Sequence, residues 1–519
     1  MKIVTTNTMA TIESLAGQKG ITPNILIKNA GSSIASWIKN DTMDTKRKTL
    51  MVLVGKGKNG SDGLVAASQL AKTFKKVTIV MPLKRIEDPY SKALNRTGIE
   101  IIKIVNKRDV RKFKLVLNET DILIDAILGT GITRTIGSPL NEIIRLVNTS
   151  RSKIFSIDMP SGIDPNSGKK DTYTVKAHTT LMLGYPKLGC VNGMNPVVCG
   201  NLEVIDIGLP GDLDKTVDHL WITKTLVKSM LSERDPKGHK GTFGTVGIVA
   251  GSLTYVGAGL LTTLGALHSG VGMVTVFTPE SQKNVVATNI PEAVFVGLPE
   301  EITSMEIDPE KSYKQFEVHS KKNKFTSLVI GPGLSTSKQS QSFIRNILEN
   351  ITDNIPVVVD ADALNTIALN KIEFTDLGSK KDITITPHVG EMSRLSGISK
   401  DTIESNRIQV ATEYARKQGI NVVLKGPATV IATHRGEVFI SPWINSGLSK
   451  AGSGDVLAGL IAGLSAQKGF SSLQACITGV YIHGLSGEYS RKKYGARSMR
   501  VLNIVNDLSN AFQNVENMN

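Results

Sequence analysis

The stretch TLMVLVGKGKNGSDGLVAASQLAKTF, residues 49–74, indicates the fold class of this chain. Its first part, residues 49–55, is a short apolar run that is typical of a strand buried in a parallel sheet. A glycine-rich loop at residues 55–63 and a helix-like run at residues 64–74 follow it directly. A strand, a glycine loop and a helix in this order begin a βαβ unit, so we predict an α/β protein with a parallel sheet.

The same alternation continues along the chain in two blocks. In the first block, further strand-like runs lie at residues 77–82, 121–131 and 153–164. In the second block, they lie at residues 245–252, 273–279, 327–333, 355–362, 382–388 and 421–433. A polar segment with Pro and Gly at residues 210–235 separates the blocks, so we predict two α/β domains, at residues 1–215 and 225–515. The polar insertion at residues 300–325 is interpreted as a surface loop.

Composition and charge narrow the classes of partner. The 519 residues carry a net charge of +15, but the basic runs are short and only 5% of the residues are aromatic. We therefore expect no nucleic-acid partner, and the positive surface suits phosphorylated small molecules instead. Three cysteines without a CxxC pair predict neither a disulfide framework nor a zinc site, which fits a reducing cytoplasm. We expect a cytoplasmic protein that forms homo-oligomers.

One uncharged segment, residues 256–278, has the length of a membrane span. It contains five glycines and His268, which favours a buried helix followed by a strand. The first 17 residues lack the charged region and continuous apolar run of a signal peptide. We therefore expect no membrane association.

The loop at residues 55–63 carries oxygen-bearing side chains as well as glycines. Gly55, Gly57 and Gly60 have the G-x-G-x-x-G spacing of dinucleotide-binding loops, in which a ligand approaches the backbone closely. Asn59 and Asp62 add hydrogen-bond acceptors or metal ligands. The alternative is a tight turn in which Asp62 caps the following helix.

Two further strand ends bring acids to the same edge of the predicted sheet. Asp125 precedes a GTG sequence at residues 129–131, and Asp158 comes shortly before Ser161. Because ligands bind at the carboxyl ends of parallel strands, we expect these residues to meet in one crevice. Asn59, Asp125 and Ser161 supply oxygen atoms that suit a monovalent or divalent cation. Asp158 is a candidate general acid or base, or else a carboxylate that stabilises its turn.

An ordered set of segments now resembles a known family. The set is GKGKNGSDG (55–63), DAILGTG (125–131), SIDMPSGID (156–164), LGYPKLG (183–189) and LEVIDIGLP (202–210), and it resembles the NAD(P)H-hydrate epimerase family. The resemblance implies a Rossmann-like three-layer α/β/α domain that interconverts the R and S forms of hydrated NADH or NADPH. It further implies that Asn59, Asp125 and Ser161 bind K⁺, and that Asp158 is the acid/base.

The same resemblance implies which residues contact the hydrated cofactor. They are Lys58, Asn59, Gly60, Ser61, Asp62, Gly129, Thr130, Gly131, Ile132, Thr133, Arg134, Thr135 and Asp158. The chain departs from the family pattern at Lys58, where an asparagine is usual, and at Ser61, where a glycine is usual. Arg134 is in a position to meet the substrate pyrophosphate.

A second glycine-rich stretch, INSGLSKAGSGDVLAGLIAGL at residues 444–464, places one acid at the start of an apolar helix. A helix that starts at or near Asp455 exposes unpaired N–H groups and a partial positive charge there. Gly452 and Gly454 let an anion approach these donors, while Asp455 can accept a proton from a hydroxyl group. These are the requirements of phosphoryl transfer. The alternative is an acid near the N-cap of a packing helix.

Other strand ends of the second block support the interpretation that Asp455 belongs to a site for phosphoryl transfer. TPHVGEM (386–392) brings His388 and Glu391, and VVVDADALN (357–365) brings Asp360 and Asp362. Glu391 with Asp360 or Asp362 can hold Mg²⁺ through water, although such acids are often structural. His388 is open to a structural or a functional interpretation. KGPAT (425–429) and GPG (331–333) are turns that suit close contact with a ligand.

These segments, together with HKGTFGTVGIVAGS (239–252), resemble the ribokinase-like superfamily and, within it, the NAD(P)H-hydrate dehydratase branch. The resemblance implies that Asp455 deprotonates the C6 hydroxyl of the S hydrate, which attacks the terminal phosphoryl group of ADP. Loss of phosphate then restores NAD(P)H, with release of AMP. The hydrate would contact Ala258, Gly333, His388 and Asp455. The nucleotide would contact Lys425, Gly426, Pro427, Ala428, Thr429, Asn445, Ser446, Gly447, Leu448, Ser449, Lys450, Ala451, Gly452, Ser453 and Gly454.

The sequence therefore predicts a bifunctional repair enzyme with small-molecule partners, hydrated NADH or NADPH and ADP. Two other functions remain open at this stage. A small-molecule kinase would use the same Asp455 turn but keep the phosphoryl group on its product. A basic RNA-binding or partner-binding protein would carry a degenerate site, and its binding would be sensitive to salt.

Overall fold

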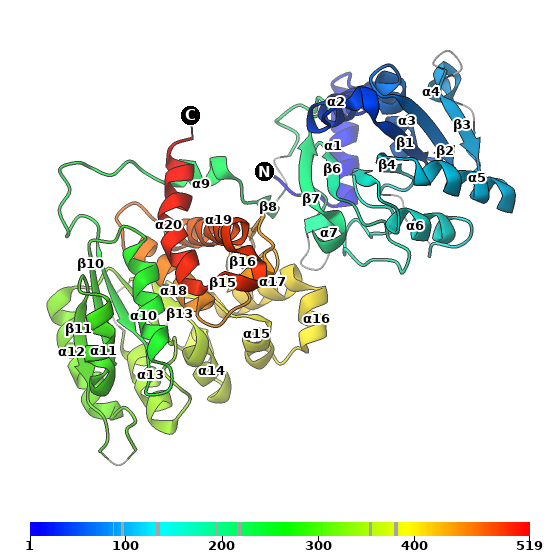
Figure 1. The fold of residues 1–519 in the computed structure, drawn as a ribbon. Coiled ribbons are helices and arrows are strands. Elements are labelled where there is room, and N and C mark those ends of the chain that lie inside the picture. The colour runs from blue at the N-terminus through cyan, green and yellow to red at the C-terminus, as the bar shows by residue number, and fades with distance from the viewer. Residues whose placement is uncertain are drawn as a thin grey trace. The chain divides into compact units, whose positions relative to one another are not determined.

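The computed structural model describes residues 1–86, 88–94, 98–130, 135–191, 196–214, 217, 219–302, 304–351, 355–377 and 382–518. The chain forms two compact units, Met1–Leu220 and Trp221–Asn519. Each unit has helices on both faces of a mainly parallel sheet (Figure 1), so the predicted α/β class is confirmed. Within the described residues, no helix combines the length and the apolar character that a membrane crossing requires.

The sheet of the first unit has seven parallel strands in the order β3-β2-β1-β4-β5-β6-β7. The strands are β1 (Thr49–Val54), β2 (Lys76–Met81), β3 (Glu100–Lys103), β4 (Ile122–Ala126), β5 (Lys153–Ile157), β6 (Thr179–Leu183) and β7 (Asn201–Ile205). The order reverses direction at β1, which places β1 and β4 side by side. This switch point is where ligands bind in open parallel sheets.

Two apolar clusters cover the two faces of this sheet and make three layers. One cluster joins the sheet to α1, α2 and α3, and the other joins it to α5 and α6. The helices are α1 (Thr6–Gln18), α2 (Pro23–Asp41), α3 (Lys58–Leu70), α4 (Pro89–Ala93), α5 (Lys107–Asn118), α6 (Leu140–Asn148), α7 (Leu188–Val191) and α8 (Pro196–Cys199).

The sheet of the second unit runs in the order β11-β10-β9-β12-β13-β14-β15-β16-β17, and β8 is its last strand. It is parallel from β11 to β15 and antiparallel from β15 to β17. The strands are β8 (His219–Trp221), β9 (Thr245–Val249), β10 (Met273–Pro279), β11 (Val294–Leu298), β12 (Ser327–Ile330), β13 (Val357–Val359), β14 (Ile383–Ile385), β15 (Asn421–Leu424), β16 (Val430–Ala432) and β17 (Val438–Ile440).

Helix α18 is the central helix of the second unit. It packs against α10, α19 and the strands β9, β12 and β13, and from Val456 to Ser465 it is buried throughout. The helices are α9 (Lys224–Met230), α10 (Val256–Leu267), α11 (Glu280–Asn289), α12 (Pro309–Asn323), α13 (Lys338–Asn350), α14 (Ala361–Leu369), α15 (Val389–Ser396), α16 (Lys400–Ser405), α17 (Arg407–Gln418), α18 (Ser453–Ser465), α19 (Ser472–Ser498) and α20 (Val501–Glu516).

The surface loop predicted at residues 300–325 is wrong, because most of this segment is the helix α12. Asp308 caps the helix by accepting the N–H of Lys311, and Pro309 occupies the first turn, where it is tolerated. Phe316 is buried against Phe277 with 5.1 Å between the ring centroids. One buried aromatic side chain on a mostly polar helix is a weak periodic signal, and the polar composition concealed it.

The glycine-rich segment at residues 55–63 also differs from a simple loop. Helix α3 begins at Lys58, with Gly57 as its N-cap residue, so Asn59 and Asp62 lie in its first turns. Asp62 therefore does not cap the helix, which removes that alternative.

Candidate active sites

A cavity of about 410 Å³ lies at the carboxyl ends of β1, β4, β5 and β6 in the first unit. Its polar wall includes Lys56, Gly57, Lys58, Asn59, Asp62, Gly129, Thr130, Asp158 and Lys187. Its apolar wall includes Met9 of α1, residues of α2, and one residue after β7; these are Met9, Leu26, Ile27, Ala30 and Ile207. A concave apolar surface with a few convergent polar groups is typical of a small-molecule site.

Two predicted cation ligands, Asn59 and Ser161, bind the backbone of Leu128, and the third, Asp125, binds Ser161. Asn59 Nδ2 donates to Leu128 O at 3.1 Å, and Leu128 N donates to Ser161 Oγ at 2.9 Å. Ser161 Oγ lies 2.6 Å from Asp125 Oδ1. Asn59 Oδ1 is buried and has no hydrogen-bond partner in the described part of the chain. A buried unpaired amide oxygen beside a hydroxyl and a carboxylate is a set of donors that fits a hard cation.

Asp158 is held in a strained turn by a buried lysine. Its φ of 65° is uncommon for a residue other than glycine and costs on the order of 1–3 kcal/mol. Asp158 Oδ1 lies 2.5 Å from Lys187 Nζ and accepts the N–H of Leu183 at 3.2 Å. Lys187 Nζ also donates to Leu183 O at 2.6 Å, and only 2% of the lysine side chain is exposed. The ion pair therefore fixes one oxygen of Asp158 in the cavity wall.

Asp62 lies in the same cavity wall, but its surroundings favour the protonated form of its carboxyl group. Burial and the charge of Asp158 raise the pKa of Asp62 well above its ordinary value. The protonated form of Asp62 is therefore favoured, whereas Asp158 forms an ion pair with Lys187. Two carboxyl groups whose surroundings favour opposite protonation states can serve as one acid and one base.

The remaining predicted residues of this site have varied surroundings. Lys58 is exposed and forms an ion pair with Glu13 of α1, with Lys58 Nζ 3.0 Å from Glu13 Oε2. Gly60 and Ser61 are buried in the first turn of α3, and Thr135 is exposed. Four predicted residues lie outside the described residues, namely Gly131, Ile132, Thr133 and Arg134.

The second unit gathers its candidate residues at the carboxyl ends of neighbouring parallel strands. Asp360 follows β13, His388 lies shortly after β14, and Lys425 follows β15. Gly333 lies after β12 with a φ of 64°, and a Cβ atom built on it would come within 2.6 Å of Ala258 Cβ on α10. The backbone of Gly333 therefore packs directly on Ala258, which leaves no space for a side chain.

The first turn of α18 lies beside these strand ends. The N-cap residue of α18 is Gly452, whose φ of 93° requires glycine, and no side chain caps the helix. Asp455 lies in the first turn, near the N-cap as the structural alternative has it, but it makes no capping hydrogen bond. The N–H groups of this turn and the helix dipole attract an anion.

Electrostatics sets Asp455 near its point of titration at neutral pH. Burial and the charge of Asp360 raise the pKa of Asp455 to about 7, while Lys425 lowers it. Lys425 Nζ lies 2.7 Å from Asp360 Oδ1 and 3.0 Å from a Cβ atom built on Gly454. The ammonium is thus adjacent to the first turn of α18. A base with this pKa next to an anion-binding turn and an ammonium fits phosphoryl transfer to a hydroxyl group.

His388 caps α15 with its ring, which defines its protonation state. His388 Nδ1 accepts the N–H groups of Gly390 at 2.9 Å and Glu391 at 3.3 Å. An atom that accepts two N–H groups carries no proton, so the neutral ring carries it on Nε2. Burial and the charge of Lys425 lower the pKa of His388 to about 4. The ring is therefore a hydrogen-bond donor through Nε2 over the whole physiological pH range.

The residues predicted to contact the nucleotide form two segments. Residues 425–429 make the turn between β15 and β16, where Ala428 N donates to Trp443 O at 3.2 Å. Residues 445–454 pass through the 3₁₀ turn η4 (Ser446–Leu448) to α18. Lys450 Nζ donates to Arg497 O on α19 at 3.0 Å, so its ammonium is engaged by a backbone carbonyl.

Several site residues escaped the sequence prediction. Lys187 lies in LGYPKLG, but nothing in the sequence around this single lysine shows that it becomes buried beside Asp158. The apolar wall from α1 and α2 is also absent from the sequence prediction, which places no helix in the first 41 residues. The pattern of buried positions in α2, Leu26, Ala30, Ile34 and Ile38, has the spacing of a helix face and was the available signal.

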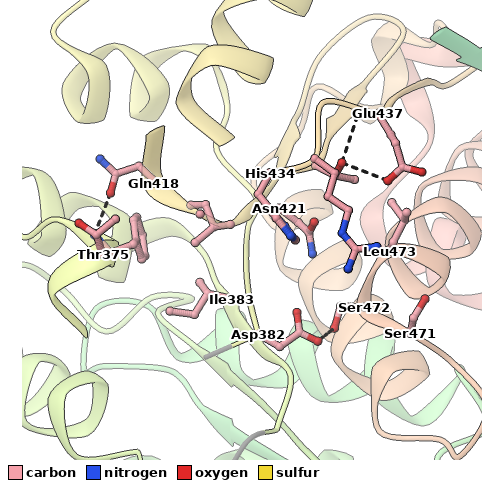
Figure 2. A pocket seen from close by; sticks show the side chains of 15 residues that line it. Thr375, Asp382, Ile383, Gln418, Asn421, His434, Glu437, Ser471, Ser472 and Leu473 are labelled. Carbon is pink, nitrogen blue, oxygen red and sulfur yellow. Dashed lines mark hydrogen bonds between the residues drawn. The ribbon is translucent and has the colours of Figure 1, made fainter. Parts of the chain in front are cut away.

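A second cavity, of about 660 Å³, lies where β14 and β15 begin (Figure 2). It is lined by Asp382, Gln418, Asn421, His434, Glu437 and Ser472, among others. Because strands β14 and β15 run parallel, this cavity is at the edge opposite Lys425 and His388. None of the predicted site residues line it.

Two α/β units, each with buried carboxyl groups at the carboxyl edge of its sheet, define a two-domain α/β enzyme. The profile described as NAD(P)H-hydrate dehydratase matches residues 246–510, and the profile described as YjeF-related protein N-terminus matches residues 23–189.

Similar proteins span the full chain. The bifunctional NAD(P)H-hydrate repair enzyme of Moorella thermoacetica is 32% identical and covers 99% of this chain and 97% of its own. The enzyme of the same name from Dictyoglomus turgidum is 32% identical, with 99% of both chains covered. An ADP/ATP-dependent NAD(P)H-hydrate dehydratase from Bacillus subtilis, co-crystallised with ATP and Mg²⁺, is 28% identical over 57% of this chain and 99% of that chain, with a TM-score of 0.49. The chain belongs to the family of bifunctional NAD(P)H-hydrate repair enzymes, and the resemblance predicted from the sequence is confirmed.

Because the His388 ring stays neutral, the pH dependence of dehydration should come from carboxyl groups. We expect kcat/KM to rise with pH through a midpoint near 7, because a base must be ionised and the pKa values of Asp455 and Glu391 are both raised to about 7. His388→Asn keeps an oxygen that can cap α15 and should leave this midpoint in place. The measurement is the pH profile of kcat/KM for both proteins. A midpoint that disappears in His388→Asn would assign the titration to the histidine instead.

Proposed function

We propose that the cavity of the first unit is the epimerase site and that the crevice at the start of α18 is the dehydratase site. The observation that supports this assignment is the presence, in each place, of a buried carboxyl group with a raised pKa next to an ammonium group. Asp62 and Asp158 lie with Lys187 in the first unit, and Asp455 lies with Lys425 in the second. Each proposed reaction depends on moving a proton from the C6 hydroxyl of the hydrate.

Epimerisation has a simple route through these two carboxyl groups. In the hydrate, C6 carries a hydroxyl and is bonded to the ring nitrogen, so the C6–N1 bond can open. Asp158 takes the hydroxyl proton as this bond breaks and C6 becomes an aldehyde, while Asp62 gives its proton to the nitrogen. Rotation about the C5–C6 bond followed by the reverse steps closes the ring on the other face. Both carboxyl groups end the cycle in their initial states, so the reaction needs no other reactant.

Lys187 supports this cycle without leaving its place. Its ammonium binds Asp158 Oδ1 and Leu183 O, which keeps the carboxyl group oriented. The apolar wall from α1 and α2 excludes water from the opened aldehyde.

The residues around Leu128 fit a bound K⁺. Asn59, Asp125 and Ser161 would hold it, and the unpaired Asn59 Oδ1 is the atom that most clearly lacks a partner. Burial raises the pKa of Asp125, and a cation beside this carboxylate would offset that effect. The ion would supply positive charge near the β4 strand end and hold the segment after β4 against α3.

Dehydration uses the crevice of the second unit. Asp455 accepts the proton of the C6 hydroxyl as this oxygen attacks the terminal phosphoryl group of ADP. The first turn of α18 and Lys425 stabilise the charge on that group. Ala258, Gly333 and the His388 Nε2 donor contact the hydrate, while residues 425–429 and 445–454 contact the nucleotide. Phosphate then leaves C6 and takes up the proton that C5 loses, which restores the C5–C6 double bond and leaves NAD(P)H, phosphate and AMP.

The acidic groups of this crevice fit a bound Mg²⁺. Asp360 Oδ2 is buried and has no partner among the described residues, and Glu391 lies nearby with a pKa raised to about 7 by burial. These carboxyl groups would hold the ion through water, and the ion would neutralise charge on the nucleotide phosphates.

We also propose that the protein works in a reducing cytoplasm. The support is that Cys190, Cys199 and Cys476 are all free and buried. The predicted homo-oligomer stays a prediction, which light scattering on the purified chain would test.

Asp455→Asn tests the base of the second unit. We expect dehydration of the S hydrate with ADP to fall by about 10²–10⁴-fold, because the amide cannot accept the hydroxyl proton. Epimerisation by the same chain should stay unchanged, and Asp401→Asn on the exposed start of α16 is the matched control. Recovery of NADPH absorbance together with release of inorganic phosphate is the measurement. Persisting dehydration in Asp455→Asn would remove this residue as the base, and a phosphorylated product from the wild type would indicate a kinase.

Replacement of K⁺ tests the cation site of the first unit. Exchange of K⁺ for tetramethylammonium should slow epimerisation and leave dehydration unchanged, because Asn59, Asp125 and Ser161 all belong to the first unit. In Asn59→Ala, epimerisation should no longer respond to K⁺. The two rates are followed in one sample by separating the R and S hydrates chromatographically. An equal loss of both activities would contradict a cation site around Leu128.

A further inference from the structure

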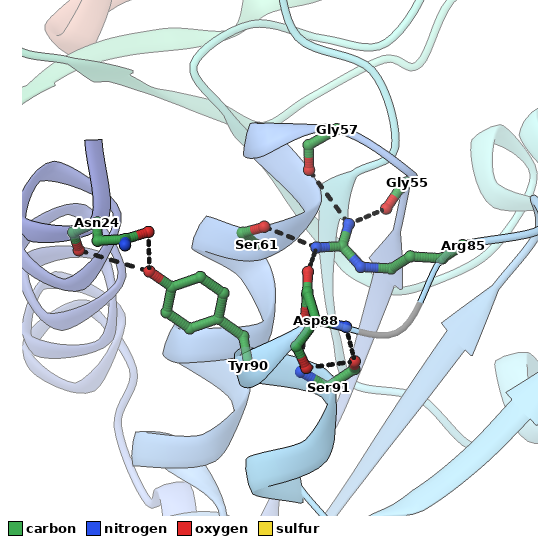
Figure 3. Close-up of polar contacts among 8 residues, drawn as sticks. All are labelled: Asn24, Gly55, Gly57, Ser61, Arg85, Asp88, Tyr90 and Ser91. Carbon is green, nitrogen blue, oxygen red and sulfur yellow. Dashed lines mark hydrogen bonds and ion pairs between the residues drawn. The ribbon is translucent and has the colours of Figure 1, made fainter.

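Arg85 lies beneath the loop that forms the polar wall of the first cavity (Figure 3). Its Nη1 donates to Gly55 O at 2.6 Å and to Gly57 O at 3.1 Å. Its Nη2 donates to Ser61 Oγ at 2.6 Å and forms an ion pair with Asp88. Only 4% of the arginine side chain is exposed. One buried guanidinium therefore holds both sides of the glycine loop and the first turn of α3.

The contacts of Arg85 fix the direction of the loop's own N–H groups. In a trans peptide group the C=O and the N–H point in opposite directions. The carbonyls of Gly55 and Gly57 point to Arg85, so the N–H groups of Lys56 and Lys58 point away from it. Lys56, Gly57 and Lys58 line the cavity. Within the described residues, the N–H groups of Lys56 and Lys58 have no hydrogen-bond acceptor.

The packing around Arg85 leaves no room for a side chain at Gly60. A Cβ atom built on Gly60 would lie 2.2 Å from Gly55 O and 2.7 Å from Arg85 Nη1, so a side chain at this position would displace the guanidinium. Asp88 caps α4 through the N–H of Ser91 and carries the charge that opposes Arg85. The loop, α3 and α4 are thus joined through one side chain.

We infer that Arg85 is a positioning residue of the epimerase, which aims the N–H groups of Lys56 and Lys58 into the cavity to bind a phosphate group of the hydrated dinucleotide. Two N–H groups without an acceptor, beside the N-terminus of α3 and the side chain of Lys56, suit an anion. Asp62 and Asp158, which carry the proton transfers, lie elsewhere in the wall. This inference rests on the proposed place of the epimerase site in the first unit.

Arg85→Lys is the direct test. It keeps the positive charge, but one ammonium cannot bridge two carbonyls, a hydroxyl and a carboxylate in fixed directions. We expect the epimerase KM for hydrated NADPH to rise by about tenfold or more, with kcat within about threefold of the wild type. The inhibition constant of inorganic pyrophosphate for epimerisation should rise in parallel. Dehydration by the same chain reports its concentration and the integrity of the second unit, and circular dichroism reports the folding of the whole chain.

A double-mutant cycle keeps the inference testable if Arg85→Lys lowers stability. Ser61→Ala removes one partner of the guanidinium and should raise KM by about two- to threefold. In the Arg85→Lys background the same change should add nothing, because the contact is already lost. Additive effects would show that Ser61 acts independently of Arg85.

The remaining outcomes separate this inference from the proposed function. Asp158→Asn should abolish turnover but leave pyrophosphate binding, measured by calorimetry, unchanged. If Asp158→Asn is inactive but Arg85→Lys has the wild-type KM and pyrophosphate inhibition constant, the role proposed for Arg85 is wrong. The proposed place of the epimerase site is then unaffected. A wild-type protein that pyrophosphate does not inhibit, or an Arg85→Lys enzyme that loses kcat alone, also overturns the inference. Absence of epimerisation in the wild type overturns the proposed function itself.

Discussion

The burial of carboxyl groups beside ammonium groups, at the carboxyl edge of each parallel sheet, is the constraint on which both sites depend. A carboxyl group taken out of water favours its neutral form, whereas a nearby ammonium favours its charged form. At Asp455 burial and Asp360 prevail over Lys425, and the pKa reaches about 7. At Asp62 burial also prevails, while Asp158 lies in direct contact with Lys187. The fold therefore decides which carboxyl group holds a proton, and thereby which one can act as a base.

Each unit also holds an arginine under its glycine-containing loop. Arg85 binds the carbonyls of Gly55 and Gly57 in the first unit. In the second unit the fully buried Arg407 donates to Leu424 O at 2.9 Å, and its guanidinium would meet a Cβ atom on Gly426 at 2.7 Å. A guanidinium can hold several carbonyls in fixed directions, which an ammonium cannot. In both units a turn that we propose to contact a ligand is thus supported from behind by a guanidinium group.

The sequence predicted the fold class and the family because local signals agreed with each other. Strand-like runs that end in glycine, proline or acids reveal the parallel sheets, and these strand ends contain Asp158, His388 and Lys425, whereas Asp455 lies at the start of a predicted helix. What could not be predicted depends on contacts between distant residues. Lys187 and Asp158 meet only when β5 and β6 pair, and Arg85 reaches the loop only when β1 and β2 pair. The helix α12 was missed because its one buried aromatic residue packs on a strand that lies elsewhere in the sequence.

We propose that one chain repairs both forms of the hydrate, because epimerisation through Asp158 converts the R form into the S form that the second unit uses. The most direct test adds ADP to an equal mixture of R and S hydrated NADPH and follows NADPH absorbance to completion. The wild type should recover all of the cofactor. Asp158→Asn should recover the S half at the normal rate, after which recovery should continue only as fast as the uncatalysed epimerisation. If Asp158→Asn recovers the R half as fast as the wild type does, the proposed role of Asp158 and the coupling of the two sites are wrong.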